Sequence, residues 1–253
     1  MPITVRQFPC LSDNYGFLVR DDATGLVACV DTPDAGAILA ELDRAGWRLT
    51  TILNTHWHPD HAGGNAEIKA ATGAEIIGPA EVLRISPLDR EVKGGETVML
   101  GETGFEVIEV GGHTLGHIAY HDAADAVAFV GDALFAMGCG RMFEGEPEQM
   151  WASLQRLAAL PEDTRVYCAH EYTASNARFA ISVDAAPQVK ARAAQVFAAR
   201  ERGEPTVPTT IGLERATNPF LRAPQLAAAV DAAGAPDHLA FAAVRLAKDQ
   251  FKG

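Results

Sequence analysis

The sequence predicts an α/β layered domain followed by an all-helical C-terminal region. Short runs rich in Val, Ile, Phe and Thr alternate with helix candidates up to about Thr173, and no such run is expected after it. Interleaved strands and helices are typical of an α/β layered domain. A chain of 253 residues is long enough for that domain and a smaller one. We therefore expect one domain over residues 1–173 and a second over residues 174–253.

The expected strands are short, and β-branched and aromatic residues are frequent in them. In chain order they are residues 3–8, Phe17–Arg20, Leu26–Asp31, Thr51–Asn54, Glu75–Ile77, Thr97–Leu100, Phe105–Val110, Ala126–Val130 and Arg165–Cys168.

Helices are expected between the strands and throughout the C-terminal region. Asp34 can cap a helix that ends at Gly46. Another is expected over Gly64–Ala71, and Pro147 opens a third, in which apolar side chains recur at helical spacing. In the second domain the expected helices span residues 174–184, 187–202, 224–233 and 236–250.

The composition argues against several classes of protein. The net charge of −12 opposes binding to nucleic acid or to an anionic membrane surface. No apolar run approaches the roughly 20 residues that span a bilayer, and the first residues lack the basic and apolar regions of a secretory signal. The four cysteines form no CxxC pair, so we expect reduced thiols and a cytoplasmic protein.

The segment THWHPDH, residues 55–61, concentrates potential metal ligands. His56 and His58 are two residues apart, so at the end of a strand their side chains project to the same side. Asp60 and His61 follow Pro59, where the chain must turn. Imidazole and carboxylate groups this close together are costly to leave without partners. The segment therefore predicts ligands for two neighbouring metal ions.

His113, Asp132 and His170 share a local context with this segment, because each lies just past a short β-type run. The ends of strands in a common sheet can converge on one edge, where loops carry functional groups. A lone histidine after a strand is more often a surface or hydrogen-bonded residue. Together with THWHPDH, however, the three residues indicate one metal site.

The roles of four other residues stay open at this point. His117 is either a partner that orients a ligand or a buried structural histidine, with a slight preference for the second. Asp31 is either a carboxylate that supports a ligand or a residue at the start of a helix. His121 and His238 are expected at the surface.

The motifs HWHPDH, GGHTLGH, VGDALFAMGCGR and VYCAHEYT resemble those of the metallo-β-lactamase superfamily. GCGR-x-FEG, CAHEYT and the terminal R-x-x-K-D narrow the resemblance to glyoxalase II, the hydroxyacylglutathione hydrolases. The resemblance spans nearly the whole chain. It implies an αββα sandwich with a C-terminal helical domain that binds glutathione. It also implies hydrolysis of S-(2-hydroxyacyl)glutathione, typically S-D-lactoylglutathione, in methylglyoxal detoxification.

The resemblance further implies a role for each candidate ligand. One ion would be held by His56, His58 and His113, the other by Asp60, His61 and His170, and Asp132 would bridge the two.

Glutathione itself, by the same resemblance, would contact Arg141, Tyr172, Arg245 and Lys248. Phe143 stands where the family often has Tyr, so one hydroxyl contact is expected to be missing. From the residues alone, Arg245 and Lys248 share one helix face, which suits a substrate with two carboxylates. Cations near a helix C-terminus are also favoured by its dipole, so the residues alone leave both explanations open.

The expected mechanism is metal-assisted hydrolysis. Divalent ions can lower the pKa of a water molecule from about 15.7 to about 7, and we expect the resulting hydroxide, shared by two ions, to attack the thioester carbonyl. Asp132 would bridge the ions, and Asp60 would accept a proton. The leaving thiolate belongs to a thiol with a pKa of about 8.5, so neither a general acid nor a cysteine nucleophile is needed.

Alternative functions differ in metal and chemistry. A persulfide dioxygenase would use one iron and oxygen, whereas Asp60, His61, His170 and the helical tail favour hydrolysis. A β-lactam hydrolase would be exported, and a nuclease is opposed by the net charge. A non-catalytic metal protein would have a closed, four-coordinate site. Zinc is the first expectation for the ions, with iron or manganese as alternatives, and the chain is expected to act as a monomer.

Overall fold

The computed structural model describes residues 2–253, and the chain divides into two compact units. Unit 1 contains the chain up to Glu109 together with Thr114–Gly131. Unit 2 contains Val110–His113 and Asp132–Gly253. The boundary predicted near residue 173 separates a layered domain from a helical tail. It does not correspond to the division into these two units, and it stays a prediction.

Unit 1 begins with a six-stranded sheet in the order β1-β2-β3-β4-β5-β6. The first three strands are antiparallel neighbours, and β3 to β6 pair in parallel. β3 is buried along its whole length, as expected for an apolar strand with both faces covered. The strands are β1 (Ile3–Cys10), β2 (Asn14–Asp21), β3 (Val27–Val30), β4 (Leu49–Leu53), β5 (Glu75–Gly78) and β6 (Arg90–Glu91).

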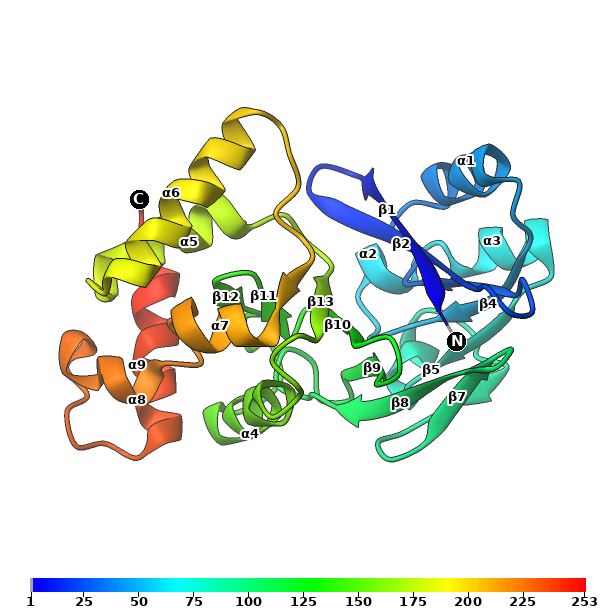
Figure 1. Cartoon of the computed structure of the whole chain (residues 1–253). Helices are drawn as coiled ribbons and strands as arrows, with labels where there is room; N and C mark the ends of the chain where they lie inside the picture. Colours follow the sequence, from blue (N-terminus) through cyan, green and yellow to red (C-terminus); the bar gives the residue numbers. More distant parts are fainter. Residues whose placement is uncertain (1) are drawn as a thin grey trace. The chain divides into compact units, whose positions relative to one another are not determined.

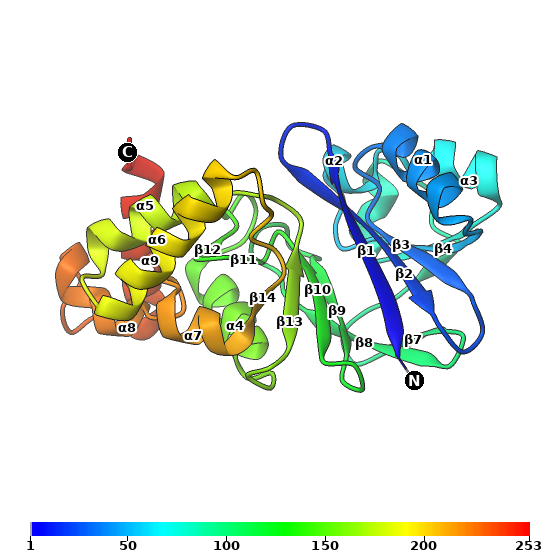
Figure 2. The ribbon, with the colours of Figure 1, turned by 45° about the horizontal axis from the view of Figure 1, so that its top comes forward.

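Two helices cover one face of this sheet, α1 (Ala35–Ala45) and α3 (Asn65–Thr72) (Figure 2). The predicted ends of α1 are confirmed: the Asp34 side chain accepts a hydrogen bond from the Ala37 N–H, and Gly46 ends the helix in the left-handed conformation. Leu18 of β2 belongs to the same buried cluster as Ile38 of α1. The apolar side chains on this face therefore hold the helices against the sheet.

A second sheet packs against the other face. Phe17 of β2 points opposite to Leu18, because side chains alternate along a strand, and its ring centroid lies 5.7 Å from that of Phe129. Phe129 in turn lies 6.4 Å from Phe105. Within unit 1 this sheet has antiparallel neighbours in chain order: β7 (Thr97–Leu100), β8 (Thr103–Glu109), β9 (Ile118–Asp122) and β10 (Val127–Gly131).

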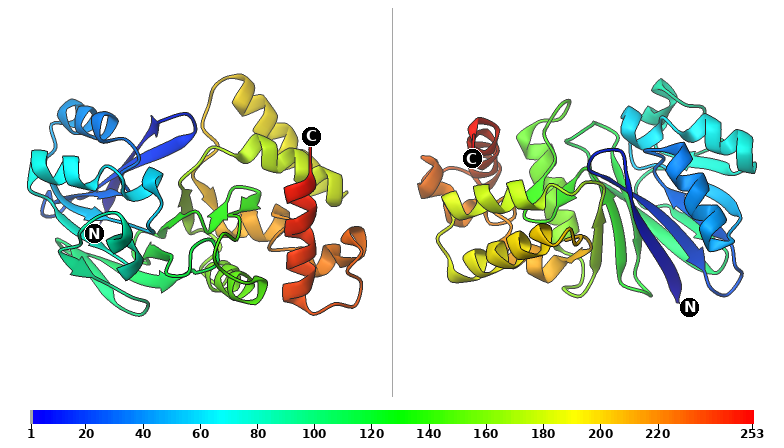
Figure 3. Two further views of the ribbon diagram at one scale, coloured as in Figure 1. Left: turned by 180° about the vertical axis from the view of Figure 1, so that it is seen from behind. Right: turned by 90° about the horizontal axis from the view of Figure 1, so that it is seen from above.

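Unit 2 is mostly helical (Figure 1). Within it, α5 packs against α6, and α9 packs against both α4 and α8 (Figure 3). The helices are α4 (Pro147–Ala158), α5 (Thr173–Val183), α6 (Pro187–Glu201), α7 (Ile211–Thr217), α8 (Ala223–Leu226) and α9 (Asp237–Gln250). Two short strand pairs accompany them: β11 (Leu134–Phe135) with β12 (Gly138–Cys139), and β13 (Arg165–Cys168) with β14 (Thr209–Thr210). No helix within residues 2–253 is long and apolar enough to cross a membrane.

Several expectations about single elements were wrong. β9 was not predicted, because His121 and Asp122 interrupt its apolar pattern. His121, expected at the surface, is only 5% exposed, since β9 pairs with β8 on one side and β10 on the other. The helix expected over residues 224–233 is two short pieces, α8 and the 3-10 helix Ala227–Val230. β14 is a strand beyond Thr173, where none was expected. It has only two residues, so its sequence contains no alternating pattern from which a strand could be predicted.

Candidate metal centre and adjoining pocket

The ligand segment of unit 1 begins where β4 ends. Backbone bonds hold its first residues: the Asn54 N–H donates to Ile77 O (2.8 Å), and the Ile118 N–H donates to Thr55 O (3.0 Å). The buried Tyr120 hydroxyl donates to Asn54 O (2.9 Å). Pro59 then starts the short helix α2 (Pro59–Ala62), in which a proline at the first position is favourable. The strand end and the helix thus present two pairs of side chains in succession.

The first pair is His56 and His58. Nε2 of His56 lies 3.1 Å from Nδ1 of His58. Nitrogens bound to one tetrahedral zinc at about 2.0–2.1 Å would lie about 3.3 Å apart. On its far side, Nδ1 of His56 is 3.0 Å from the Thr55 hydroxyl oxygen. The spacing of this pair fits two ligands of one ion.

The second pair is Asp60 and His61, and Asp31 supports it. Nε2 of His61 lies 3.5 Å from Oδ2 of Asp60, while Nδ1 lies 2.8 Å from Oδ2 of Asp31. Asp31 also accepts hydrogen bonds from the N–H (2.8 Å) and the hydroxyl (2.7 Å) of Thr55. A carboxylate at one ring nitrogen leaves the other nitrogen to face a metal. The open question about Asp31 is thereby answered, because Asp34 caps the helix.

Asp31 itself has a backbone φ of 56°, a conformation that residues other than glycine rarely adopt. Its three side-chain hydrogen bonds hold it there, as is common at functional sites. His117 is also buried, and its ring stacks on that of His56 with centroids 4.5 Å apart. His117 therefore supports a ligand by ring contact rather than lying apart from the site.

The ligand candidates of unit 2 are arranged around Asp132. Its Oδ2 lies 3.3 Å from Nε2 of His113, and its Oδ1 lies 3.3 Å from Nε2 of His170. Nδ1–H of His113 donates to the Arg141 carbonyl (2.8 Å), which again leaves Nε2 for a metal. One carboxylate therefore offers a different oxygen to each of two imidazoles, as a bridge between two ions requires. A donor set of imidazoles and carboxylates fits divalent ions such as zinc, iron or manganese.

Gly140 allows the chain to pass close to Asp132 and His113. A Cβ atom at this position would lie 2.0 Å from Asp132 O and 3.1 Å from Nδ1 of His113. Any other residue would displace one of these two candidate ligands. The second glycine of the GCGR segment, Gly140, is therefore required by the geometry of the site.

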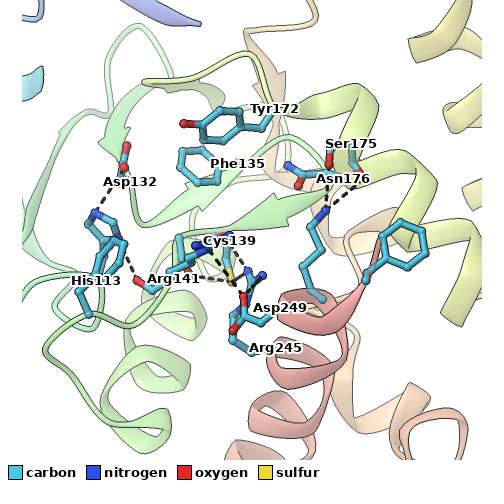
Figure 4. Close-up of a pocket in the computed structure, with 14 residues that line it drawn as sticks. His113, Asp132, Phe135, Cys139, Arg141, Tyr172, Ser175, Asn176, Arg245 and Asp249 are labelled. Carbon is cyan, nitrogen blue, oxygen red and sulfur yellow. Dashed lines mark hydrogen bonds and ion pairs between the residues drawn. The ribbon is translucent and has the colours of Figure 1, made fainter. Parts of the chain in front are cut away.

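A cavity of about 530 Å³ adjoins these ligands within unit 2 (Figure 4). His113 and Asp132 lie on one side of it, and Ser175 and Asn176 lie on another. The four side chains predicted to contact glutathione line this cavity, and so does Phe143, which stands where the family often has Tyr: Arg141, Phe143, Tyr172, Arg245 and Lys248. Sequence reasoning missed other lining residues, namely Phe135, Cys139, Ser175, Asn176, Asp249 and Phe251. Of these, Phe135 and Cys139 lie within the motif VGDALFAMGCGR and Asp249 ends R-x-x-K-D, whereas Ser175, Asn176 and Phe251 lie outside the motifs.

The three cations of the cavity differ in how far they are already paired. Arg245 is 4% exposed and donates to Cys139 O (3.1 Å) and Asp249 Oδ1 (2.9 Å). The Arg141 side chain is 68% exposed, with Nε 3.8 Å from Asp249 Oδ1. Arg245 therefore shapes the wall of the cavity, whereas Arg141 is the more accessible charge.

Lys248 is intermediate between them. Its ammonium donates to the Ser175 carbonyl (3.2 Å) and hydroxyl (3.1 Å). Burial, together with the positive charges of Arg245, Arg178 and Arg141, lowers the pKa of Lys248 to about 8. A bound anion would favour the charged form of this group.

The thiols do not have the properties of nucleophiles. All four cysteines are free and buried. Burial raises the pKa of Cys139 to about 11 and that of Cys10 and Cys168 to about 12, and it raises the pKa of Cys29 as well. Thiolates are therefore scarce at neutral pH, in agreement with a reaction that needs no cysteine.

Both parts of the chain match the sequence models of known protein families. Residues 10–170 match the sequence model of the metallo-beta-lactamase superfamily, and residues 171–251 match that of the hydroxyacylglutathione hydrolase C-terminus. The hydroxyacylglutathione hydrolase of Erythrobacter litoralis is 54% identical over 98% of this chain and 100% of its own length. That of Maricaulis maris is 53% identical over 98% of this chain and 99% of its own.

Solved structures agree on the fold. ETHE1 from Myxococcus xanthus is 27% identical with a TM-score of 0.66, and the match covers 86% of this chain and 84% of that one. TTHA1623 in a di-iron-bound form is 26% identical with a TM-score of 0.63, covering 86% and 100%. The predicted metallo-β-lactamase-like fold with a helical C-terminal region is confirmed. The chain belongs to the hydroxyacylglutathione hydrolases, metal-binding hydrolases of the metallo-β-lactamase superfamily.

Proposed function

We propose that this chain hydrolyses the thioester of S-(2-hydroxyacyl)glutathione, with S-D-lactoylglutathione as the typical substrate, to glutathione and D-lactate. One observation carries the proposal. A single cavity of unit 2 is lined both by the ligand candidates His113 and Asp132 and by the cations Arg141 and Lys248. Such a cavity can hold an anionic substrate with its reactive bond beside a metal.

We propose two divalent ions per chain, with zinc as the first expectation and iron or manganese as alternatives. The spacing of the ligand atoms within each unit supports an assignment of the seven side chains. His56, His58 and His113 would hold one ion, Asp60, His61 and His170 the other, and Asp132 would bridge them. Bound there, the ions would supply Lewis acidity and lower the pKa of a water molecule from about 15.7 to about 7.

The protein's own groups then have distinct tasks. Arg141 and Lys248 attract the two carboxylates of the glutathione moiety and so fix the thioester relative to Asp132. Asp60 accepts a proton from the attacking water. The sulfur departs as a thiolate, whose thiol has a pKa of about 8.5, so no acid needs to protonate it. Remote charge pairing of this kind lowers KM, and bond cleavage is left to the metal centre.

We further propose that residues 174–253 form the glutathione-binding domain, since Arg245 and Lys248 of α9 line the cavity. The side chains of Phe143 and Tyr172 would complete the contacts. We also propose a monomer that acts in the cytoplasm, which the four free cysteines support. Sedimentation of the purified protein would test the monomer.

The test combines metal analysis and a thiol assay on one purified sample. We expect about two metal ions per chain and release of thiol from S-D-lactoylglutathione in equal amount to D-lactate. Asp132→Ala should abolish release, while Arg141→Ala should mainly raise KM. Oxygen consumption with glutathione persulfide, without thioester hydrolysis, would instead identify an oxidative enzyme.

A further inference from the structure

We propose that Glu81 is a positioning residue of the metal centre, which fixes the loop between His113 and His117. The inference rests on the proposed function, because the group that Glu81 positions is a metal ligand. Glu81 lies in the 3-10 helix Ala80–Arg84, outside every motif of the sequence.

The carboxylate of Glu81 holds two loop donors at once. Its Oε1 accepts a hydrogen bond from the Thr114 hydroxyl (2.5 Å), and its Oε2 accepts one from the Gly116 N–H (2.6 Å). All three residues belong to unit 1. Hydrogen bonds to an ionised carboxylate are roughly twice as strong as those between neutral groups. The two oxygens therefore clamp the loop at two points.

This clamp acts next to a ligand. Thr114 follows His113 directly, and consecutive Cα atoms are about 3.8 Å apart, so fixing Thr114 limits where His113 can lie. His113 also has contacts of its own within unit 2: its carbonyl accepts from the Phe143 N–H (3.2 Å) and its Nδ1–H donates to Arg141 O. The position of His113 is thus fixed both by its own contacts and by the clamp on the residue that follows it.

The other end of the loop leads to His117, a residue that contacts another ligand candidate. Gly116 precedes His117, whose ring stacks on that of His56. A Cβ atom at Gly116 would lie 2.9 Å from Oε2 of Glu81, so a glycine lets the carboxylate approach the backbone. Leu115 between the two clamped residues is 55% exposed. Polar contacts, rather than burial of this apolar side chain, therefore hold the tip of the loop.

The experiment compares zinc affinity among matched variants. Glu81→Ala removes both acceptors, and Thr114→Val removes one donor. Glu81→Gln keeps an oxygen for the Gly116 N–H and an amide that can donate to the Thr114 hydroxyl, and Thr114→Ser keeps the hydroxyl. Glu96→Ala is the control, because Glu96 accepts from the Lys93 N–H (3.1 Å) elsewhere in unit 1.

Zinc affinity is measured by competition with a chromophoric chelator, beside KM, kcat and the melting temperature of the metal-free protein. We expect Glu81→Ala and Thr114→Val to bind zinc about tenfold more weakly and to lose kcat, because groups that hold a ligand affect metal affinity on this scale. KM should stay nearly unchanged. Glu81→Gln, Thr114→Ser and Glu96→Ala should remain close to the wild type.

Unchanged zinc affinity in Thr114→Val overturns the proposal, even if Glu81→Ala fails to fold. An equal loss of affinity in Glu96→Ala also overturns it, because the effect would then be general destabilisation. A wild-type protein that binds no zinc and releases no thiol refutes the proposed function instead. The two failures are therefore distinguishable.

Discussion

At the scale of single residues, hydrogen bonds at the remote ring nitrogens determine which atoms can face a metal. Asp31 binds Nδ1 of His61, and the Arg141 carbonyl binds Nδ1 of His113. Both leave Nε2 toward the neighbouring carboxylate. At Arg141, the backbone carbonyl holds the ring of the ligand candidate His113, while the side chain lines the cavity proposed to bind the substrate. In the proposed function, this residue links the metal centre to substrate binding.

The first residue-scale prediction concerns Asp31. Asp31→Ala should weaken zinc binding roughly 10–100-fold, because the His61 ring loses the group that orients it. The variant should also be destabilised, by about 1–3 kcal/mol for each buried donor of Thr55 left without an acceptor. Competition with a chelator measures the affinity, and urea unfolding of the metal-free protein measures the stability.

Asp34→Ala is the matched control for this experiment. It removes the helix cap to the Ala37 N–H (3.0 Å), which costs about 1 kcal/mol, but it leaves the His61 ring untouched. Equal zinc affinities of Asp31→Ala and Asp34→Ala would contradict the role of Asp31.

The second residue-scale prediction concerns the pH dependence of KM. The pKa of Lys248 is lowered to about 8, so the ammonium is present below that pH and lost as the pH rises through it. If only the ammonium attracts the substrate carboxylate, KM should rise up to about tenfold between pH 7 and pH 9. Lys248→Arg should flatten this rise, because an arginine stays charged. The same rise in both proteins would assign the titration to another group, such as the substrate amine.

At the scale of elements, local signals predicted some parts and missed others for physical reasons. The cap residues of α1 lie within the helix sequence itself, so Asp34 and Gly46 could be recognised. β9 could not, because its buried polar residues are tolerated only where neighbouring strands cover them. α7 could not either, because the buried Glu214 interrupts its short apolar pattern. Such elements depend on contacts far apart in the sequence.

Glu214 supplies the prediction at this scale. Its carboxylate pairs with the buried Arg192 of α6 and accepts hydrogen bonds from the Met137 N–H (2.9 Å) and the Asn218 side chain (2.8 Å). Asn218 also donates to Gly138 O (2.8 Å) in the β11–β12 hairpin. Glu214→Gln leaves Arg192 buried without a counterion, so we expect a loss of about 3–5 kcal/mol in the free energy of unfolding.

Urea unfolding measures this loss. A double variant, Arg192→Met with Glu214→Gln, is the comparison, because it leaves no unpaired ion while the new amide oxygen can still accept from the Met137 N–H, and it should therefore cost less than Glu214→Gln alone. A double variant that is less stable than the single one would contradict the explanation by an unpaired buried charge.

At the scale of the whole molecule, the sequence predicted which residues are candidate ligands but not how they are divided between units. THWHPDH is a local pattern, so its four ligand candidates could be recognised together. They belong to unit 1, while His113, Asp132 and His170 belong to unit 2. That division follows from contacts across the whole chain, which no local pattern contains. The predicted ligand set therefore draws on both units.

This division leads to the last prediction, on metal removal. If the ions are held by residues of both units, chelation should abolish activity and loosen both units together. Ligand binding at a concentration 100 times Kd stabilises a protein by about 2.7 kcal/mol, and each kcal/mol shifts the melting temperature of a chain of this size by roughly 2–4 °C. We therefore expect a fall of about 5–10 °C on chelation, reversed when metal is restored.

Hydrogen exchange locates the effect along the chain. Protection should fall on chelation both in residues 54–62 and around His113 and His170, whereas Asp132→Ala should show a smaller change because it already lacks the carboxylate proposed to bridge the ions. Exchange that changes in one unit only would show that the ions do not draw ligands from both. Full activity after complete chelation would refute metal-dependent hydrolysis itself, because the proposed attacking hydroxide forms only when the ions lower the pKa of a water molecule.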